Sequence, residues 1–169
     1  SALGNLEPEN YDEYFDLAFL DELKKLDEKP DNKMIVDMRK QSREIFHKVF
    51  PALQELFPGY EVYSSEEDLY EPISELQFTR FLKGFIDLVV KTPDGKYHII
   101  DWKSCSWGWD MKRKSEPMTT YQLTLYKKFF CEKHDIDPKM VETYFGLLKR
   151  TAKKDNVEIF RVTSGPRKT

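Results

Sequence analysis

The strongest constraint on the fold comes from two apolar segments joined by a short turn. Residues 84–91 (GFIDLVVK) and 97–103 (YHIIDWK) are rich in the β-branched and aromatic residues that favour strands. Between them, residues 92–96 (TPDGK) have the Pro-Asp-Gly chemistry of a tight loop. We therefore predict that residues 84–103 form an antiparallel hairpin, against which the rest of the chain packs.

Each strand of this hairpin carries an acidic residue among its apolar ones. Asp87 lies between Ile86 and Leu88, and Asp101 lies two residues before Lys103 near the end of the returning strand. Since side chains at i and i+2 share one face of a strand, Asp101 and Lys103 project together. A simple register across the loop places Asp87 close to Asp101.

This juxtaposition suits a metal ion and a phosphate. Two neighbouring carboxylates repel one another unless a cation lies between them, and Mg²⁺ prefers oxygen ligands. Lys103 would then hold a phosphate or orient the attacking water, as in metal-assisted phosphodiester hydrolysis. The alternative is a salt-bridged sheet face, because D-x-K spacing arises by chance in many chains. The second acid in the neighbouring strand favours the metal site.

Of the other segments, some have the apolar period of a helix and others the alternation of a strand. Pro51 is expected to kink or split the second helix, and residues 104–118 show no regular period. The predicted helices are residues 11–26, 34–57 and 118–131, and the predicted further strands are residues 60–63, 74–82, 141–149 and 157–163.

Length and composition restrict the class of protein. A chain of 169 residues with 14% aromatic residues suits one folded domain and excludes a disordered tail. No apolar run approaches the roughly 20 residues of a membrane span, and the opening residues lack the features of a secretory signal. Two cysteines cannot build a disulfide framework or a four-Cys metal site. We expect an intracellular protein without a membrane partner.

Charge is distributed unevenly along the chain. Residues 1–80 contain 9 Lys/Arg and 19 Asp/Glu, whereas residues 81–169 contain 18 and 11, for a net charge of −3 overall. A basic half indicates a polyanion partner for one face. The alternative is a solvated surface on which the charges mix.

Gln122 and Tyr126 form a second polar feature, one helical turn apart. They lie beside the apolar stripe of the predicted 118–131 helix, with Leu125 and Phe129. A polar amide at this place needs hydrogen-bond partners or faces a cleft. The alternative is an ordinary residue at the helix border.

These residues form three motifs that follow one another along the chain: GxxD at 84–87, DxK at 101–103 and QxxxY at 122–126. In this order and at these separations they resemble the RecB-type branch of the PD-(D/E)XK nuclease superfamily, over about residues 34–163. The resemblance implies an α/β fold with a restriction-endonuclease-like core, a central mixed β-sheet flanked by helices. The chain is expected to form one compact domain, in which an acidic helical segment over residues 1–33 precedes the nuclease part over residues 34–169.

The resemblance assigns roles to the motif residues. Asp87 and Asp101 would be metal ligands for one or two Mg²⁺ or Mn²⁺ ions, with the main-chain carbonyl of Trp102 as a third. Lys103 would be the catalytic lysine, and the two residues of the QxxxY motif, Gln122 and Tyr126, would line the site.

The first motif of the family is a helix residue upstream of the sheet, often His. His47 is the candidate here, with a solvated helix residue as the equal alternative. Glu44 is a substitute ligand if the helix is rotated, and Glu71 and Glu75 are weaker substitutes.

The chain also departs from some members of the branch. It lacks the four cysteines of the iron–sulfur members, so no cluster is expected, and it has no Walker A motif. These departures favour a phage-type or recombination exonuclease acting on DNA, with a helicase or recombination protein as partner. The alternatives are a non-catalytic nucleic-acid-binding module on the same fold and a protein-interaction domain.

The segment after Lys103 is a candidate path for DNA, because aromatic rings and cations together suit single strands. Burial of both tryptophan rings is the alternative, and the basic cluster around Lys153 is interpreted as a solvated turn. The candidate contacts are Trp107, Trp109, Lys112, Arg113 and Lys114.

Overall fold

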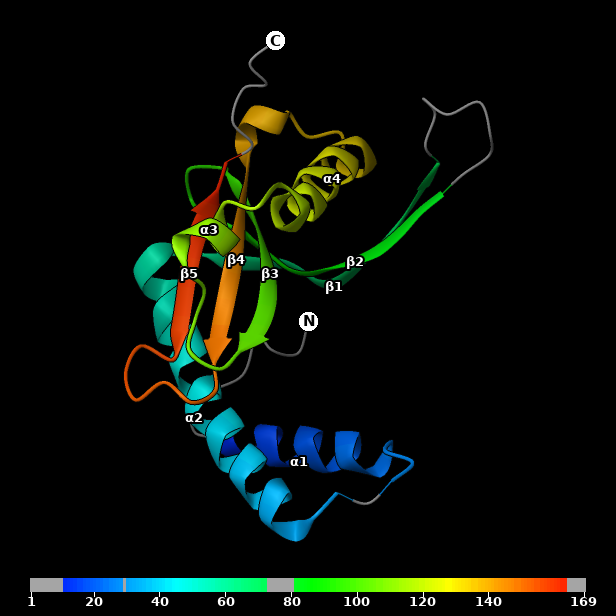
Figure 1. Cartoon of the computed structure of the whole chain (residues 1–169). Coiled ribbons are helices and arrows are strands. Elements are labelled where there is room, and N and C mark those ends of the chain that lie inside the picture. Colours follow the sequence, from blue (N-terminus) through cyan, green and yellow to red (C-terminus); the bar gives the residue numbers. More distant parts are fainter. Residues whose placement is uncertain (1–10, 29, 73–80, 164–169) are drawn as a thin grey trace.

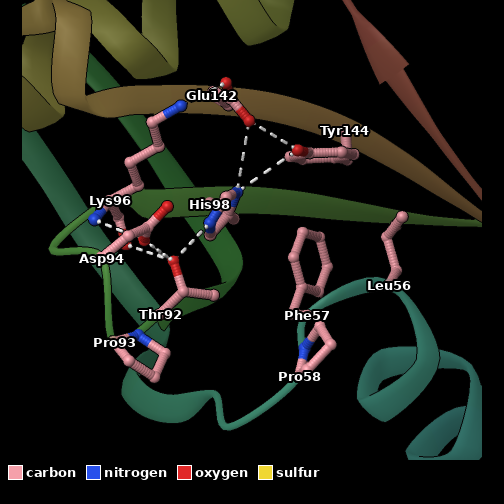
Figure 2. Close-up of a pocket in the computed structure, with 10 residues that line it drawn as sticks. All are labelled: Leu56, Phe57, Pro58, Thr92, Pro93, Asp94, Lys96, His98, Glu142 and Tyr144. Carbon is pink, nitrogen blue, oxygen red and sulfur yellow. Dashed lines mark hydrogen bonds and ion pairs between the residues drawn. The ribbon is translucent and has the colours of Figure 1, made fainter.

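A computed structural model describes residues 11–28, 30–72 and 81–163 of the chain, and Figure 1 shows its arrangement. Its helices are α1 (Tyr11–Lys24), α2 (Asn32–Leu56), α3 (Met111–Lys114) and α4 (Pro117–His134), with a 3₁₀ turn at η3 (Pro138–Met140). Its strands are β1 (Glu61–Pro72), β2 (Phe81–Lys91), β3 (Tyr97–Cys105), β4 (Val141–Lys149) and β5 (Val157–Val162).

The strands form one mixed sheet in the order β1-β2-β3-β4-β5. Neighbouring strands are antiparallel except β3 and β4, which run parallel and are connected through α4. The predicted hairpin is confirmed, with Leu88 opposite Ile100 and Val90 opposite His98. The chain thus has the α/β architecture expected of it, a mixed sheet with helices against its faces.

The two faces of the sheet are covered by different helices (Figure 1). Ile99 of β3 belongs to a buried cluster with Leu123 of α4, whereas Ile100 belongs to another with Leu53 of α2. Because side chains alternate along a strand, Asp101 and Lys103 share the α4 face with Ile99. The fold therefore places the polar residues of β3 between the sheet and α4.

Of the two outcomes predicted at Pro51, a kink or a split, the split does not occur. Pro51 lies inside α2, which continues without interruption to Leu56. Leu53 and Phe57, beyond the proline, are each 2% exposed and pack on Ile100 and Tyr144. This burial stabilises the last turns and offsets the backbone hydrogen bond that proline cannot make.

The structure extends β1 well past the predicted strand 60–63. The sequence does not predict this extension, because its acidic residues conceal the alternation of apolar and polar side chains. The alternation is also interrupted by a register shift between Val62 and Ser64 and by the left-handed backbone of Glu66 (φ 50°). Most of the predicted strand 74–82 lies outside the described residues. The short helix α3 occupies part of the segment expected to be irregular.

Among the residues that the structure describes, no helix has both the length and the apolar character to cross a membrane.

The β3–β4 pairing generates a prediction at Gly146, which lies opposite Trp102. A Cβ atom at this position would lie 2.2 Å from Cε3 of the Trp102 ring. Gly146→Ala is expected to lower the free energy of unfolding by about 1–3 kcal/mol, the usual cost of overpacking, as measured by urea denaturation. In a Trp102→Ala background the same substitution should cost much less, and an equal cost in both backgrounds would contradict the account.

Candidate active site

Asp87 and Asp101 meet where the β2–β3 hairpin opens toward α4. The paired part of the hairpin ends at Leu88 and Ile100, so both aspartates lie one residue beyond it. The amide of Trp102 donates a 2.8 Å hydrogen bond to Oδ2 of Asp87. This bond holds the Asp87 carboxylate beside β3, as the simple register predicted.

Asp101 is a buried carboxylate with incomplete hydrogen bonding. Only 4% of the residue is exposed, and its Oδ2 lies 2.9 Å from Nζ of Lys103. Within the described part of the chain, this oxygen accepts no hydrogen bond of regular geometry, so the contact is an ion pair. Burial raises the pKa of Asp101, the Lys103 ammonium opposes that rise, and the Asp87 carboxylate adds to it.

The QxxxY residues complete the cluster from the side of α4. Nε2 of Gln122 donates to Oη of Tyr126 at 2.7 Å, and Nζ of Lys103 donates to Oε1 of Gln122 at 3.5 Å. One amide therefore connects the lysine to the phenol. Burial raises the pKa of Tyr126, and the two aspartates raise it further, so the phenol stays neutral near pH 7.

Gly84 explains how Tyr126 reaches this cluster. A Cβ atom on Gly84 would lie 3.1 Å from Cε1 of the tyrosine ring. The glycine of the GxxD motif thus leaves room for the tyrosine of the QxxxY motif. The sequence predicts that Gln122 and Tyr126 line a site, but not that they form a hydrogen bond with each other. Their i, i+4 spacing is the sequence feature that indicates this bond.

His47 and Glu44 do not join the aspartates. Nε2 of His47 lies 2.6 Å from Oδ1 of Asp12 on α1, and both His47 and Glu44 line a separate groove on α2. Helix α2 packs on the sheet face opposite to Asp101, which is why these side chains are not brought to it. The structure thus brings neither side chain to the aspartates, and of the two interpretations of His47 it favours an exposed helix residue. Glu71 and Glu75 cannot be assessed, since Glu75 lies outside the described residues and the Glu71 side chain is not described.

The donor set at Asp87 and Asp101 fits a divalent cation in part. Two carboxylates adjoin one another, and a buried oxygen of one lacks a regular hydrogen bond, which suits a hard cation. No group of three His, Cys, Asp or Glu side chains that could hold a metal occurs among the residues described. The remaining ligands would be water, substrate oxygens or the Trp102 carbonyl, which stays a prediction.

The candidate DNA-contact segment is divided by the fold. Trp107 is 78% exposed, whereas the Trp109 ring packs against Phe145 at 5.2 Å between ring centroids. The guanidinium of Arg113 lies over the Trp109 ring at 4.5 Å, and Lys114 forms an ion pair with Glu158.

Trp109 is therefore partly buried and packs against the core of the fold. Lys114 is engaged with Glu158, whereas Lys112 and Arg113 are exposed on α3. Of the two tryptophans, only Trp107 presents its ring to solvent.

Comparison with known proteins identifies one family. The family model of the PD-(D/E)XK nuclease superfamily matches residues 3–167. Among solved structures, the chain is similar to one titled "Crystal structure of SSO0001", with 14% sequence identity and a TM-score of 0.44; the similarity covers 92% of this chain and 60% of that chain. The chain thus spans about 60% of the length of that protein. No curated protein matches the sequence.

Burial of the Asp101 carboxylate leads to a prediction about stability. Without a cation, a buried carboxylate is costly, so Asp101→Asn is expected to raise the free energy of unfolding by about 1 kcal/mol. The measurement is urea denaturation in EDTA near pH 7. Asp27→Asn removes the same charge from an exposed residue and should change little. A less stable Asp101→Asn variant would contradict the account.

Proposed function

The chain belongs to the PD-(D/E)XK nuclease superfamily, and from this premise we propose that it hydrolyses phosphodiester bonds in DNA with Mg²⁺ or Mn²⁺ as cofactor. The observation that carries the proposal is the meeting of three motifs at one place. Asp87 and Asp101 adjoin, and Lys103 lies 2.9 Å from one carboxylate and 3.5 Å from the Gln122 amide. A merely structural salt bridge has no need of the second carboxylate.

Asp87 and Asp101 would hold the cation in this proposal. A bound divalent ion supplies the Lewis acidity that activates water and offsets charge on the phosphate. The Trp102 amide fixes the Asp87 carboxylate, so this ligand is preorganised. The buried position of Asp101 keeps competing water away from its oxygens, which strengthens electrostatic interactions at the site.

Lys103 would stabilise the negative charge that develops on the phosphate. Its ammonium is held from two sides, by Asp101 and by the Gln122 carbonyl oxygen. The neutral Tyr126 phenol accepts a hydrogen bond from the Gln122 amide, so its own O–H remains available to donate to a phosphate oxygen. Gln122 thus positions two groups that would contact the substrate.

The branch of the superfamily and the kind of substrate are part of the same proposal. The joint presence of GxxD, DxK and QxxxY supports the RecB-type branch, and the exposed Trp107 two residues beyond β3 supports a single strand or a duplex end as substrate. We therefore favour an exonuclease over an endonuclease. A helicase or recombination protein as partner and the division of the chain at residue 33 belong to the same proposal.

Cleavage of end-labelled DNA tests the function. In Mn²⁺ or Mg²⁺ the wild type should degrade single-stranded or duplex DNA, and Lys103→Ala should reduce the rate by about a hundredfold or more, because a transition-state cation is lost. Lys139→Ala removes the same charge from an exposed site outside the cluster and should leave the rate unchanged. Full activity of Lys103→Ala, or none in the wild type, would contradict the proposal.

Binding of a single strand tests the role of Trp107. If its ring stacks on a base, Trp107→Ala should weaken binding by about 1–3 kcal/mol, as measured by fluorescence anisotropy in EDTA. Trp107→Phe keeps an aromatic ring and should retain most of the affinity. Met111→Ala alters a residue that is equally exposed, at 78%, and serves as the control. Equal affinity of Trp107→Ala and the wild type would exclude stacking at this residue.

A further inference from the structure

A row of basic side chains follows one side of α2, away from the active site. Arg39, Arg43 and His47 occur at i, i+4 and i+8, so they lie one above another at intervals of about 6 Å along the helix. Together with Lys40 they line a groove of about 460 Å³, to which Val36 and Glu44 also contribute. We call Arg39, Lys40, Arg43 and His47 the basic stripe.

Two carboxylates of α1 occupy this stripe. Asp16 accepts two hydrogen bonds from Arg39, at 3.1 Å from Nε and 2.7 Å from Nη2. Asp12 contacts Arg43 at 2.9 Å from Nε and 2.8 Å from Nη2, and His47 at 2.6 Å. A forked arginine contact of this kind serves a phosphate as well as a carboxylate.

The attachment of α1 is polar and exposed. None of the side chains from Asp12 to Lys24 is buried, and Leu17 and Leu20 of α1 are 62% and 52% exposed. Phe15 makes an apolar contact with α2, since its ring lies 5.6 Å from that of Phe46. Exposed ion pairs contribute little to stability and weaken in salt, so a stronger polyanion can replace them.

Asp12 and Asp16 are both charged at neutral pH. The hydrogen bond from Arg43, with a smaller effect of His47, lowers the pKa of Asp12 to about 2. Arg39 likewise lowers the pKa of Asp16. Both side chains are therefore anions at neutral pH, as a phosphate diester is.

We propose that α1 is a displaceable acidic cover, and that the basic stripe beneath it binds the sugar–phosphate backbone of DNA when Asp12 and Asp16 are released. This inference rests on the proposed function, since it takes DNA as the ligand. It also gives a role to the acidic N-terminal part of the chain, in which Asp and Glu outnumber Lys and Arg.

The acidic cover is expected to change the affinity for DNA and not the rate of the cleavage step. Helix α2 packs through Leu53 on the sheet face opposite to Asp101, so the stripe contacts DNA outside the catalytic cluster. Release of α1 should therefore raise affinity and leave the rate of cleavage at saturating DNA unchanged. Phosphate contacts of this kind carry no sequence preference.

Binding of a fluorescein-labelled single-stranded oligodeoxynucleotide in EDTA tests the proposal on the full chain. The test variant is Asp12→Asn with Asp16→Asn. The matched control is Asp21→Asn with Glu22→Gln, which changes the net charge equally but alters acids that pair with Lys25. The test variant should bind about three- to tenfold more tightly than the control at low salt, and the difference should shrink as salt rises.

Adding Arg39→Gln and Arg43→Gln to the test variant should remove the gain. Equal affinities of the test variant and the control would overturn the proposal, because net charge alone would then account for any increase. Persistence of the gain without the two arginines would overturn it as well. Thermal unfolding of each variant should change little, since no α1 side chain from Asp12 to Lys24 is buried.

Amide hydrogen exchange gives a direct test of displacement. On addition of the oligodeoxynucleotide, amides of α1 (Tyr11–Lys24) should exchange faster, because the helix leaves α2; protection of α1 would overturn the proposal. These readouts are independent of cleavage. A chain that binds in this way but never cleaves DNA refutes the proposed nuclease function alone, and a nuclease without the affinity difference refutes the cover alone.

Discussion

The alternation of side chains along β3 determines where chemistry can occur in this molecule. Ile100 and Trp102 face α2, and Ile99, Asp101 and Lys103 face α4. The Trp102 ring packs over Gly146 of β4. The backbone amide of Trp102 donates a hydrogen bond to the Asp87 carboxylate. A single strand thus contributes to the core on both faces of the sheet and places Asp101 on the face that α4 covers.

The charges of Asp87, Asp101 and Lys103 are better suited to binding a ligand than to stabilising the fold. Asp101 is buried, its pKa is raised by that burial, and among the described residues one of its oxygens makes an ion pair with Lys103 and no regular hydrogen bond. Such a carboxylate reduces stability unless something else neutralises it. In the proposed function, a cation held with Asp87 would provide that neutralisation, and the same cation would supply the chemistry of hydrolysis.

Much of this could be predicted from local patterns. The hairpin and its register followed from the apolar strands around the Pro-Asp-Gly turn, and i, i+2 spacing placed Asp101 with Lys103. The position of His47 could not be predicted in this way, because helical periodicity does not show which face of the sheet a helix covers. Likewise, the burial that carries α2 past Pro51 and the packing of Trp109 on Phe145 are tertiary effects with no local signal.

The central claim is that Asp87 and Asp101 together hold a divalent cation beside Lys103. Electron paramagnetic resonance of Mn²⁺ titrated into the protein without DNA measures this binding directly. The account predicts loss of free Mn²⁺ signal with the wild type, and much weaker binding by Asp87→Asn and by Asp101→Asn, each of which removes one ligand. Equal Mn²⁺ binding by the wild type and both variants would contradict it.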